Sequence, residues 1–78
     1  MNKIRRKNIE EILQSLEESL SELVNERDDE QEYFDNMPES FQGSERGEKS
    51  ESAISSLTDL IDNMESGIAD IRENCGTP

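Results

Sequence analysis

The stretch NMPESFQGSERGE, residues 36–48, decides the fold, because it holds one of the two prolines of the chain and two of its four glycines. Pro38 disfavours helical geometry at the residue before it, so a helix that enters this stretch ends there. Gly43 permits a turn, and Ser44 followed by Glu45 is typical of a helix N-cap with a charge that suits the helix dipole. The stretch therefore predicts a bend between two helices.

Before the bend, apolar residues recur at spacings of four, three, four and three, which is a heptad pattern. They are Ile9, Leu13, Leu16, Leu20 and Leu23. Ile12 and Val24 widen this row into the broader stripe of a helix with more than one neighbour. The pattern lapses at Arg27 and Glu30 and resumes in phase at Phe34. Because the phase is kept, the sequence predicts one continuous helix.

After the bend, the same design returns with spacings of three and four. The residues are Ile54, Leu57, Ile61, Met64, Ile68 and Ile71. The fold class predicted is all-α, an antiparallel helical hairpin of two long helices in a single domain over residues 1–78. The boundaries predicted are a helix over about 3–36, a loop over 37–44, a helix over about 45–73 and a short tail over 74–78.

The two predicted helices have matched lengths, so they can cover each other when the chain folds back. The numbers of facing residues should then add up to about 81 to 84. We expect Leu20 beside Ile61 or Met64, and Leu13 beside Ile68 or Ile71. Phe41, the only large apolar residue of the loop, is expected to cover the ends of both helices.

Two helices alone leave much of their apolar stripes in water, and so few apolar side chains barely offset an ordering entropy of about 1.5 kcal/mol per residue. A second copy would cover these stripes in a homodimeric four-helix bundle. The residues expected in this oligomer seam are Leu13, Leu16, Leu20, Leu23, Leu57, Ile61, Met64 and Ile68.

The net charge is −12, and four of the eight basic residues are Lys3, Arg5, Arg6 and Lys7. The remaining chain holds four basic and twenty acidic residues, a net charge of −16. Such a body repels nucleic acid and anionic membranes and favours a basic protein surface as partner. The alternative is that the charge only keeps the helices in solution. The basic segment could contact nucleic acid or membrane, but without interleaved aromatic residues its signal is weak.

The densest negative charge precedes the bend. The candidate partner-binding residues are Glu26, Asp28, Asp29, Glu30, Glu32 and Asp35. Carboxylates along a rod can imitate DNA, which carries one negative charge per about 1.7 Å of duplex. The alternative is an ordinary solvated face.

Several single residues have two interpretations. Arg27 and Glu30 stand at seam positions, where they form either a polar layer or, as favoured here, side chains that reach out to water. Asn8 could cap a helix that starts after the basic segment. Gly67 either admits a close helix or is tolerated at a cost of about 1 kcal/mol relative to alanine.

Catalytic chemistry has little support in this composition. The chain contains no histidine, and carboxylates alone are common on any acidic helix. We therefore expect a non-enzymatic protein with no cofactor and no metal. The lone Cys75 is unable to form an internal disulfide, and no apolar run reaches the length of a membrane span. These features favour a cytoplasmic location.

The segment DDEQEYFDNMPESFQGSERGEKSESAISSLTDLIDNMESGIADI, residues 28–71, resembles small acidic proteins encoded by phages, prophages and mobile elements of low-GC Gram-positive bacteria. The likeness is greatest from Tyr33 to Glu48, above all in NMPES and GSER. In those proteins the position of Gly47 more often carries a larger residue, commonly tyrosine. The resemblance implies a helical hairpin in a bacterial host.

Two functional hypotheses follow. The first is a phage-type accessory protein that binds a basic host protein, inhibiting a nucleic-acid-processing defence enzyme through an acidic, DNA-mimicking surface. The second is a structural or assembly module that acts only by coiled-coil oligomerisation or bridging. Neither requires direct contact with nucleic acid or membrane.

Overall fold

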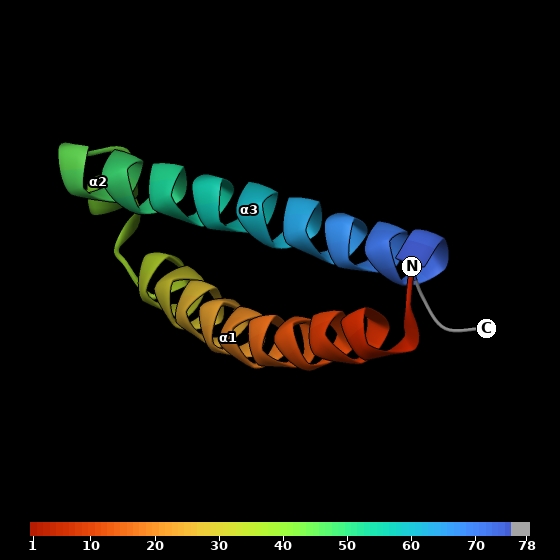
Figure 1. Ribbon diagram of the computed structural model, residues 1–78. Coiled ribbons are helices and arrows are strands. Elements are labelled where there is room, and N and C mark those ends of the chain that lie inside the picture. Colours follow the sequence, from red (N-terminus) through yellow and green to blue (C-terminus); the bar gives the residue numbers. More distant parts are fainter. Residues whose placement is uncertain (76–78) are drawn as a thin grey trace.

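The computed structural model describes residues 1–75 and contains three helices: α1 (Lys3–Asp35), α2 (Glu39–Gln42) and α3 (Glu45–Cys75). The long helices α1 and α3 lie side by side and run in opposite directions, with α2 at the turn between them (Figure 1). The predicted pair of long antiparallel helices is therefore confirmed, and its pairing with a second copy stays a prediction. The predicted tail starts inside α3, and residues 76–78 lie outside the described part.

The first helix begins at Lys3, directly after its N-cap residue Asn2. The side-chain oxygen of Asn2 accepts a hydrogen bond of 2.7 Å from the backbone N–H of Arg5, which satisfies one of the free donors of the first turn. The alternative cap at Asn8 is therefore wrong, because the basic segment is itself helical. α1 ends where predicted, before Pro38.

The loop contains the short helix α2, which the sequence did not predict. The side-chain amide of Gln42 donates hydrogen bonds of 3.1 Å to the backbone carbonyls of Phe34 and Met37. Gln42 thus caps the carbonyl end of α1 and ties α2 to it, while Met37 is buried beneath. The expectation for Phe41 is wrong: its side chain is 55% exposed, because the polar Gln42 does the capping instead.

The second long helix begins as the sequence predicted. The hydroxyl of Ser44 accepts a long hydrogen bond of 3.5 Å from the N–H of Gly47. The backbone carbonyl of Ser44 accepts a hydrogen bond of 2.9 Å from the N–H of Glu48. Glu45 and Glu48 stand in the first turn of α3 and Arg72 in the last, so the charges at both ends suit the helix dipole.

The two long helices pack through a small core over the half of the hairpin away from the loop. Leu13, Leu20, Ile61 and Ile68 are buried, with Ile9, Leu23, Val24 and Met64 partly buried against them. The polar contacts on either side of this core join Glu30 to Ser50 and Glu10 to Arg72, so facing residue numbers add up to 80 and 82. The predicted register is therefore correct to within about one residue.

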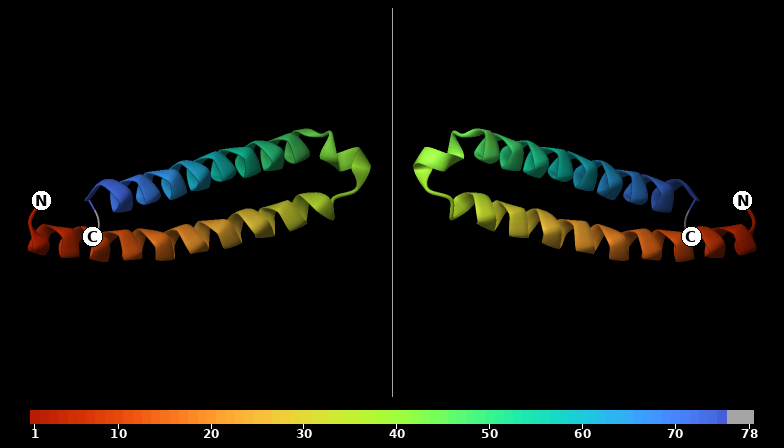
Figure 2. Two further views of the ribbon diagram at one scale, coloured as in Figure 1. Left: turned by 90° about the vertical axis from the view of Figure 1, so that its right-hand side faces the viewer. Right: turned by 90° about the vertical axis from the view of Figure 1, so that its left-hand side faces the viewer.

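The molecule is a thin rod. Its Cα atoms extend over 58 × 16 × 15 Å, and its radius of gyration is 17.4 Å, against about 11.5 Å for a compact domain of this length. The helices stay side by side along the rod in both further views, and the N-terminus lies at the end away from the loop (Figure 2). Gly67 has open space around the position of a Cβ, so no helix of the hairpin approaches it closely.

Candidate interaction surfaces

The acidic surface predicted on α1 is largely present. Glu26, Asp28, Asp29, Glu32 and Asp35 are all exposed. Two of these carboxylates have a local partner, since Arg27 pairs with Asp28 at 3.2 Å and the amide of Gln31 donates to Asp35 at 3.0 Å. These are surface contacts within one helix, so the carboxylates remain accessible to a partner protein.

Glu30 differs from the other five acidic residues, because it turns toward α3. Its carboxylate accepts a hydrogen bond of 2.6 Å from the hydroxyl of Ser50, whose residue is only 5% exposed. The interpretation that the side chain of Glu30 reaches out to water is therefore wrong, and the polar-layer alternative applies to it. A buried hydroxyl needs an acceptor, and the carboxylate opposite supplies one.

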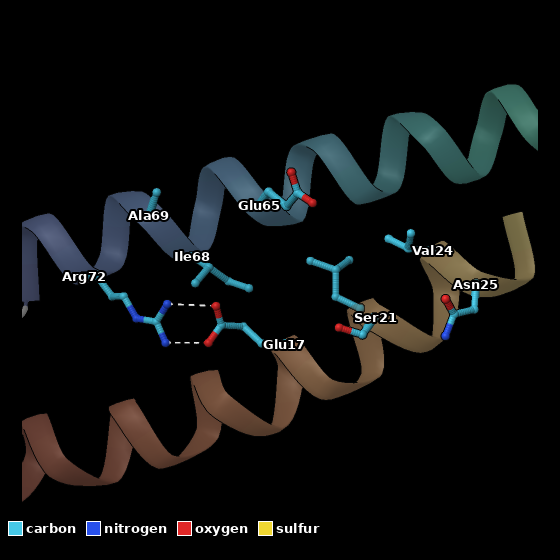
Figure 3. Close-up of a pocket in the computed structure, with 9 residues that line it drawn as sticks. Glu17, Ser21, Val24, Asn25, Glu65, Ile68, Ala69 and Arg72 are labelled. Carbon is cyan, nitrogen blue, oxygen red and sulfur yellow. Dashed lines mark hydrogen bonds and ion pairs between the residues drawn. The ribbon is translucent and has the colours of Figure 1, made fainter. Parts of the chain in front are cut away.

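A guanidinium group joins the two long helices near the end away from the loop. Arg72 of α3 donates two hydrogen bonds to Glu10, at 3.2 and 2.9 Å. It donates two more to Glu17, at 2.9 and 2.6 Å (Figure 3). The hydrogen bonds from Arg72 lower the pKa of Glu17 below its ordinary value. Sequence reasoning missed this cluster, although the predicted register already set Arg72 opposite Glu10.

The lowered pKa of Glu17 predicts a pH dependence. Its stabilising contribution is fully present above the ordinary pKa of 4.5 and is lost as the pH falls through the lower folded pKa. The Glu17→Gln variant should therefore melt below the wild type at pH 7, and the gap should be smaller at a pH below 4.5. Thermal melts followed by circular dichroism at both pH values measure the gap.

A matched control for this prediction is Glu18→Gln, which removes the same charge from an exposed position of α1. In a chain of net charge −12, removal of one exposed carboxylate should leave the melting temperature unchanged or slightly raised. Equal effects of the two substitutions at pH 7 would contradict the role of the Arg72 contact.

A groove of about 760 Å³ runs between the long helices on the side of Arg72. Its lining combines the core residues Leu20, Val24 and Ile68 with a polar rim (Figure 3). The polar residues of the rim are Glu17, Ser21, Asn25, Glu65 and Arg72, and the small residue Ala69 lies among them. One side of the hairpin is thus polar along both of its edges.

The opposite side of the hairpin carries an exposed apolar face. On α1, Ile12 and Leu16 lie on the other side of the buried row from Glu17 and Ser21, as the 3.6-residue period requires. On α3, Leu60 and Ile71 likewise lie on the other side of the buried row from Glu65 and Ala69. Glu17, Ser21, Glu65 and Ala69 all line one groove, so the four large apolar residues share the opposite side.

We call this side the apolar face. Four of its side chains are strongly exposed: Ile12 at 59%, Leu60 at 46%, Ile71 at 40% and Leu16 at 38%. Leu23, Leu57 and Met64 border it and are half-buried. Leu16 belongs to the predicted seam but does not lie in the core of the hairpin, so the predicted seam divides between an internal contact and this outer face.

Two further features lie near the ends of the rod. Near the loop, Tyr33, Met37 and Phe41 line a hollow of about 400 Å³ together with Asn36, Pro38 and Arg46. At the other end, the basic residues of the first turns of α1 are all exposed: Lys3, Arg5, Arg6 and Lys7.

Within residues 1–75, no group of side chains is arranged to hold a metal ion. None of the described helices combines the length and the apolar character that crossing a bilayer demands. Comparison with known protein families, curated proteins and solved structures finds no match to this chain. The acidic surface of α1 and the apolar residues on one side of the hairpin are the surfaces open to a partner.

Proposed function

We propose that this chain is a non-enzymatic assembly module that acts by pairing its apolar face with a second helical surface, in the first place that of another copy. The observation that carries the proposal is the exposure of Ile12, Leu16, Leu60 and Ile71 on one side of the rod. Contiguous apolar side chains of this size mark interaction sites on soluble domains.

The accessible surface supports the same proposal. It amounts to 5942 Å² for a chain of 8.9 kDa, whereas a compact monomer of that mass exposes about 4,800 Å². The excess of about 1,100 Å² exceeds the area of about 800 Å² that each partner buries in a standard interface. A single hairpin thus has enough surplus surface to form a stable contact.

The small core gives a physical reason for the pairing. The two long helices share only Leu13, Leu20, Ile61 and Ile68 as buried core residues, which is little for a chain of 78 residues. A partner that binds only the folded hairpin stabilises it by mass action. Association and folding are therefore coupled in this proposal.

The test is the oligomeric state at rising concentration. We expect sedimentation and light scattering to detect a dimer at micromolar concentrations and a monomer for the double variant Ile12→Lys with Leu60→Lys. Two buried lysines without partners should weaken association at least 100-fold, since an unpaired charge in an interface costs several kcal/mol.

A control for this test carries the same two charges on the groove side, as Ser21→Lys with Ala69→Lys. This variant should remain dimeric, because both positions lie opposite the apolar face. A wild-type chain that stays monomeric at about 0.5 mM would contradict the proposal, because a dissociation constant above this range corresponds to less than about 5 kcal/mol.

A second candidate function rests on the exposed carboxylates of α1. In this proposal a phage-type protein of the bacterial cytoplasm uses Glu26, Asp28, Asp29, Glu32 and Asp35 to occupy the basic groove of a host defence enzyme that processes nucleic acid. Reversal of Asp28 and Asp29 to lysine should abolish binding of such a partner and leave self-association intact. A partner whose binding is insensitive to salt would contradict the mimicry.

A further inference from the structure

We propose that the second copy docks on the apolar face with its rod reversed, so that α1 packs against α1 of the partner subunit and α3 against its α3. The two loops then lie at opposite ends of a four-helix bundle. This arrangement rests on the self-association proposed above and adds its geometry. It follows from the order of residues along the apolar face.

On α1, the apolar face changes character from one end to the other. Arg5 stands seven residues before Ile12, and Glu30 stands seven residues after Leu23, so all four lie on the same side of the helix. The row is basic at its start, apolar in its middle and acidic at its end, where the internal contact with Ser50 uses Oε2 of Glu30 and Oε1 remains for a partner. A row of this kind is complementary to its own reverse, because each end then meets the opposite charge.

The pairs on α1 define one two-fold axis. If Ile12 faces Leu23 of the partner subunit, the axis crosses α1 between residues 17 and 18. The same axis sets Arg5 opposite the partner's Glu30, because the midpoint of those two positions is identical. Apolar contact and charge complementarity thus agree on one register without any adjustment.

The row on α3 gives an axis at the same level. In this arrangement Leu60 faces Ile71 of the partner subunit, and Met64 faces Gly67 of the partner subunit. The midpoint of each pair lies between residues 65 and 66, where the two-fold axis crosses α3. The contact of Glu10 with Arg72 aligns the level of residues 17 and 18 with that of residues 64 and 65. The two axes therefore differ by about one residue, or about 1.5 Å.

Gly67 supplies an independent reason for this contact. A Cβ at this position meets nothing within 4 Å in the hairpin, so the hairpin alone does not require a glycine in the middle of a helix. In the reversed dimer this gap receives Met64 of the partner subunit, whose unbranched side chain fills irregular spaces well. A small residue opposite a large one allows the two α3 helices to approach.

The competing arrangement has its two-fold axis along the rod and brings both loops to the same end. It separates Arg5 from the partner's Glu30 by about 37 Å of helix, since the two positions are 25 residues apart at about 1.5 Å each. The charges at the ends of the α1 row then make no contact with each other. Only the reversed arrangement uses them.

The decisive experiment measures the distance between the two loops. Gly43 is exposed and a Cβ there meets nothing within 4 Å, so Gly43→Cys combined with Cys75→Ser accepts one spin label per chain. We expect electron–electron double resonance to give about 55 to 60 Å between labels, twice the rise from residue 17 or 18 to the loop.

A distance below about 30 Å, roughly two helix diameters with the label arms, would overturn the reversed arrangement and leave self-association standing. A labelled chain that is monomeric at 0.5 mM, alongside a monomeric wild type, would overturn both proposals together. Sedimentation of the unlabelled wild type in the same buffer separates these two outcomes from an effect of the label.

A charge-reversal experiment tests the ends of the row. Arg5→Glu should weaken the dimer roughly three- to ten-fold, because the Arg5 contact occurs twice by symmetry and each becomes a repulsion. Glu30→Arg should weaken it more strongly, because it also removes the acceptor of the Ser50 hydroxyl, and an equimolar mixture of the two variants should associate more tightly than either variant alone. In that mixture, both ends of α1 again meet opposite charges.

The control for charge reversal is Lys7→Glu, which changes the net charge equally within the same turn of α1 but points away from the apolar face. It should change affinity less than two-fold at 0.15 M salt, where exposed charges are screened. Equal weakening by Lys7→Glu and Arg5→Glu, or no recovery in the mixture, would overturn the pairing of Arg5 with the partner's Glu30.

Discussion

Replacement of Ile61 with alanine is expected to remove most of the stability of the folded hairpin. Ile61 is 3% exposed and is one of the four buried apolar residues at the contact of α1 with α3. Loss of a buried isoleucine side chain to alanine costs about 2–5 kcal/mol, which combines lost burial with the cavity left behind. A single core in a chain of this size rarely supplies more than about 3–5 kcal/mol.

The measurement is urea unfolding followed by the helical signal at 222 nm, with the folded fraction in water as the readout. Ile4→Ala is the matched control, because the same atoms are removed from a residue of α1 that is 75% exposed. That control should change the free energy of unfolding by less than about 0.5 kcal/mol. If the two alanine variants unfold at the same urea concentration, the packing of α1 on α3 through Ile61 is wrong.

The second large effect is expected at Gly47, where α3 begins. A Cβ at this position would overlap the backbone carbonyl oxygen of Gln42 and lie 2.5 Å from its carbonyl carbon. Both atoms belong to the backbone, so α2 must move away as a unit if any side chain is present. Gly47→Ala should therefore destabilise the hairpin by about 1–3 kcal/mol, the range for added atoms in a packed site.

The displacement caused by Gly47→Ala has a second consequence. The side chain of Gln42 donates to the carbonyl of Phe34 in the last turn of α1 and to that of Met37 just after it. Movement of the Gln42 backbone should break both hydrogen bonds and expose Met37 to solvent. Amide hydrogen exchange at the end of α1 and at α2 should speed up in this variant, whereas exchange at the core should change less.

Gly43→Ala is the control for the Gly47 experiment, because a Cβ at residue 43 meets nothing within 4 Å and its φ of −84° suits alanine. It should leave stability unchanged within about 0.5 kcal/mol. Unaltered stability of Gly47→Ala would refute the close contact between Gln42 and α3.

The arrangement of the long helices was predictable because it depends on periodicity. The recurring apolar spacing before and after Pro38 determined both helices, and their equal lengths determined which residues face each other. Even the contact of Arg72 with Glu10 follows from that register. The contact was not predicted, because a single arginine adds no periodic signal to an acidic helix.

The corner was less predictable because its contacts are not periodic. The residues of α2 are too few to display a helical pattern, and the role of Gln42 depends on where α1 ends in space. Phe41 was expected to be buried because it is apolar, yet the exposed carbonyls at the end of α1 need a hydrogen-bond donor more than an apolar cover. Glu30 faces Ser50 for a related reason, because the buried Ser50 hydroxyl needs a hydrogen-bond acceptor.

The matched arms of the rod also constrain how the gene can change in length. An insertion in only one long helix shifts its residues along the other helix. Leu20 would then no longer pack in one core with Ile61, and Glu10 would no longer contact Arg72. Seven residues added to both arms restore all rows and lengthen the rod by about 10.5 Å, while the corner keeps its own contacts. The hairpin therefore keeps its packing between α1 and α3 only when insertions of seven residues occur in both helices.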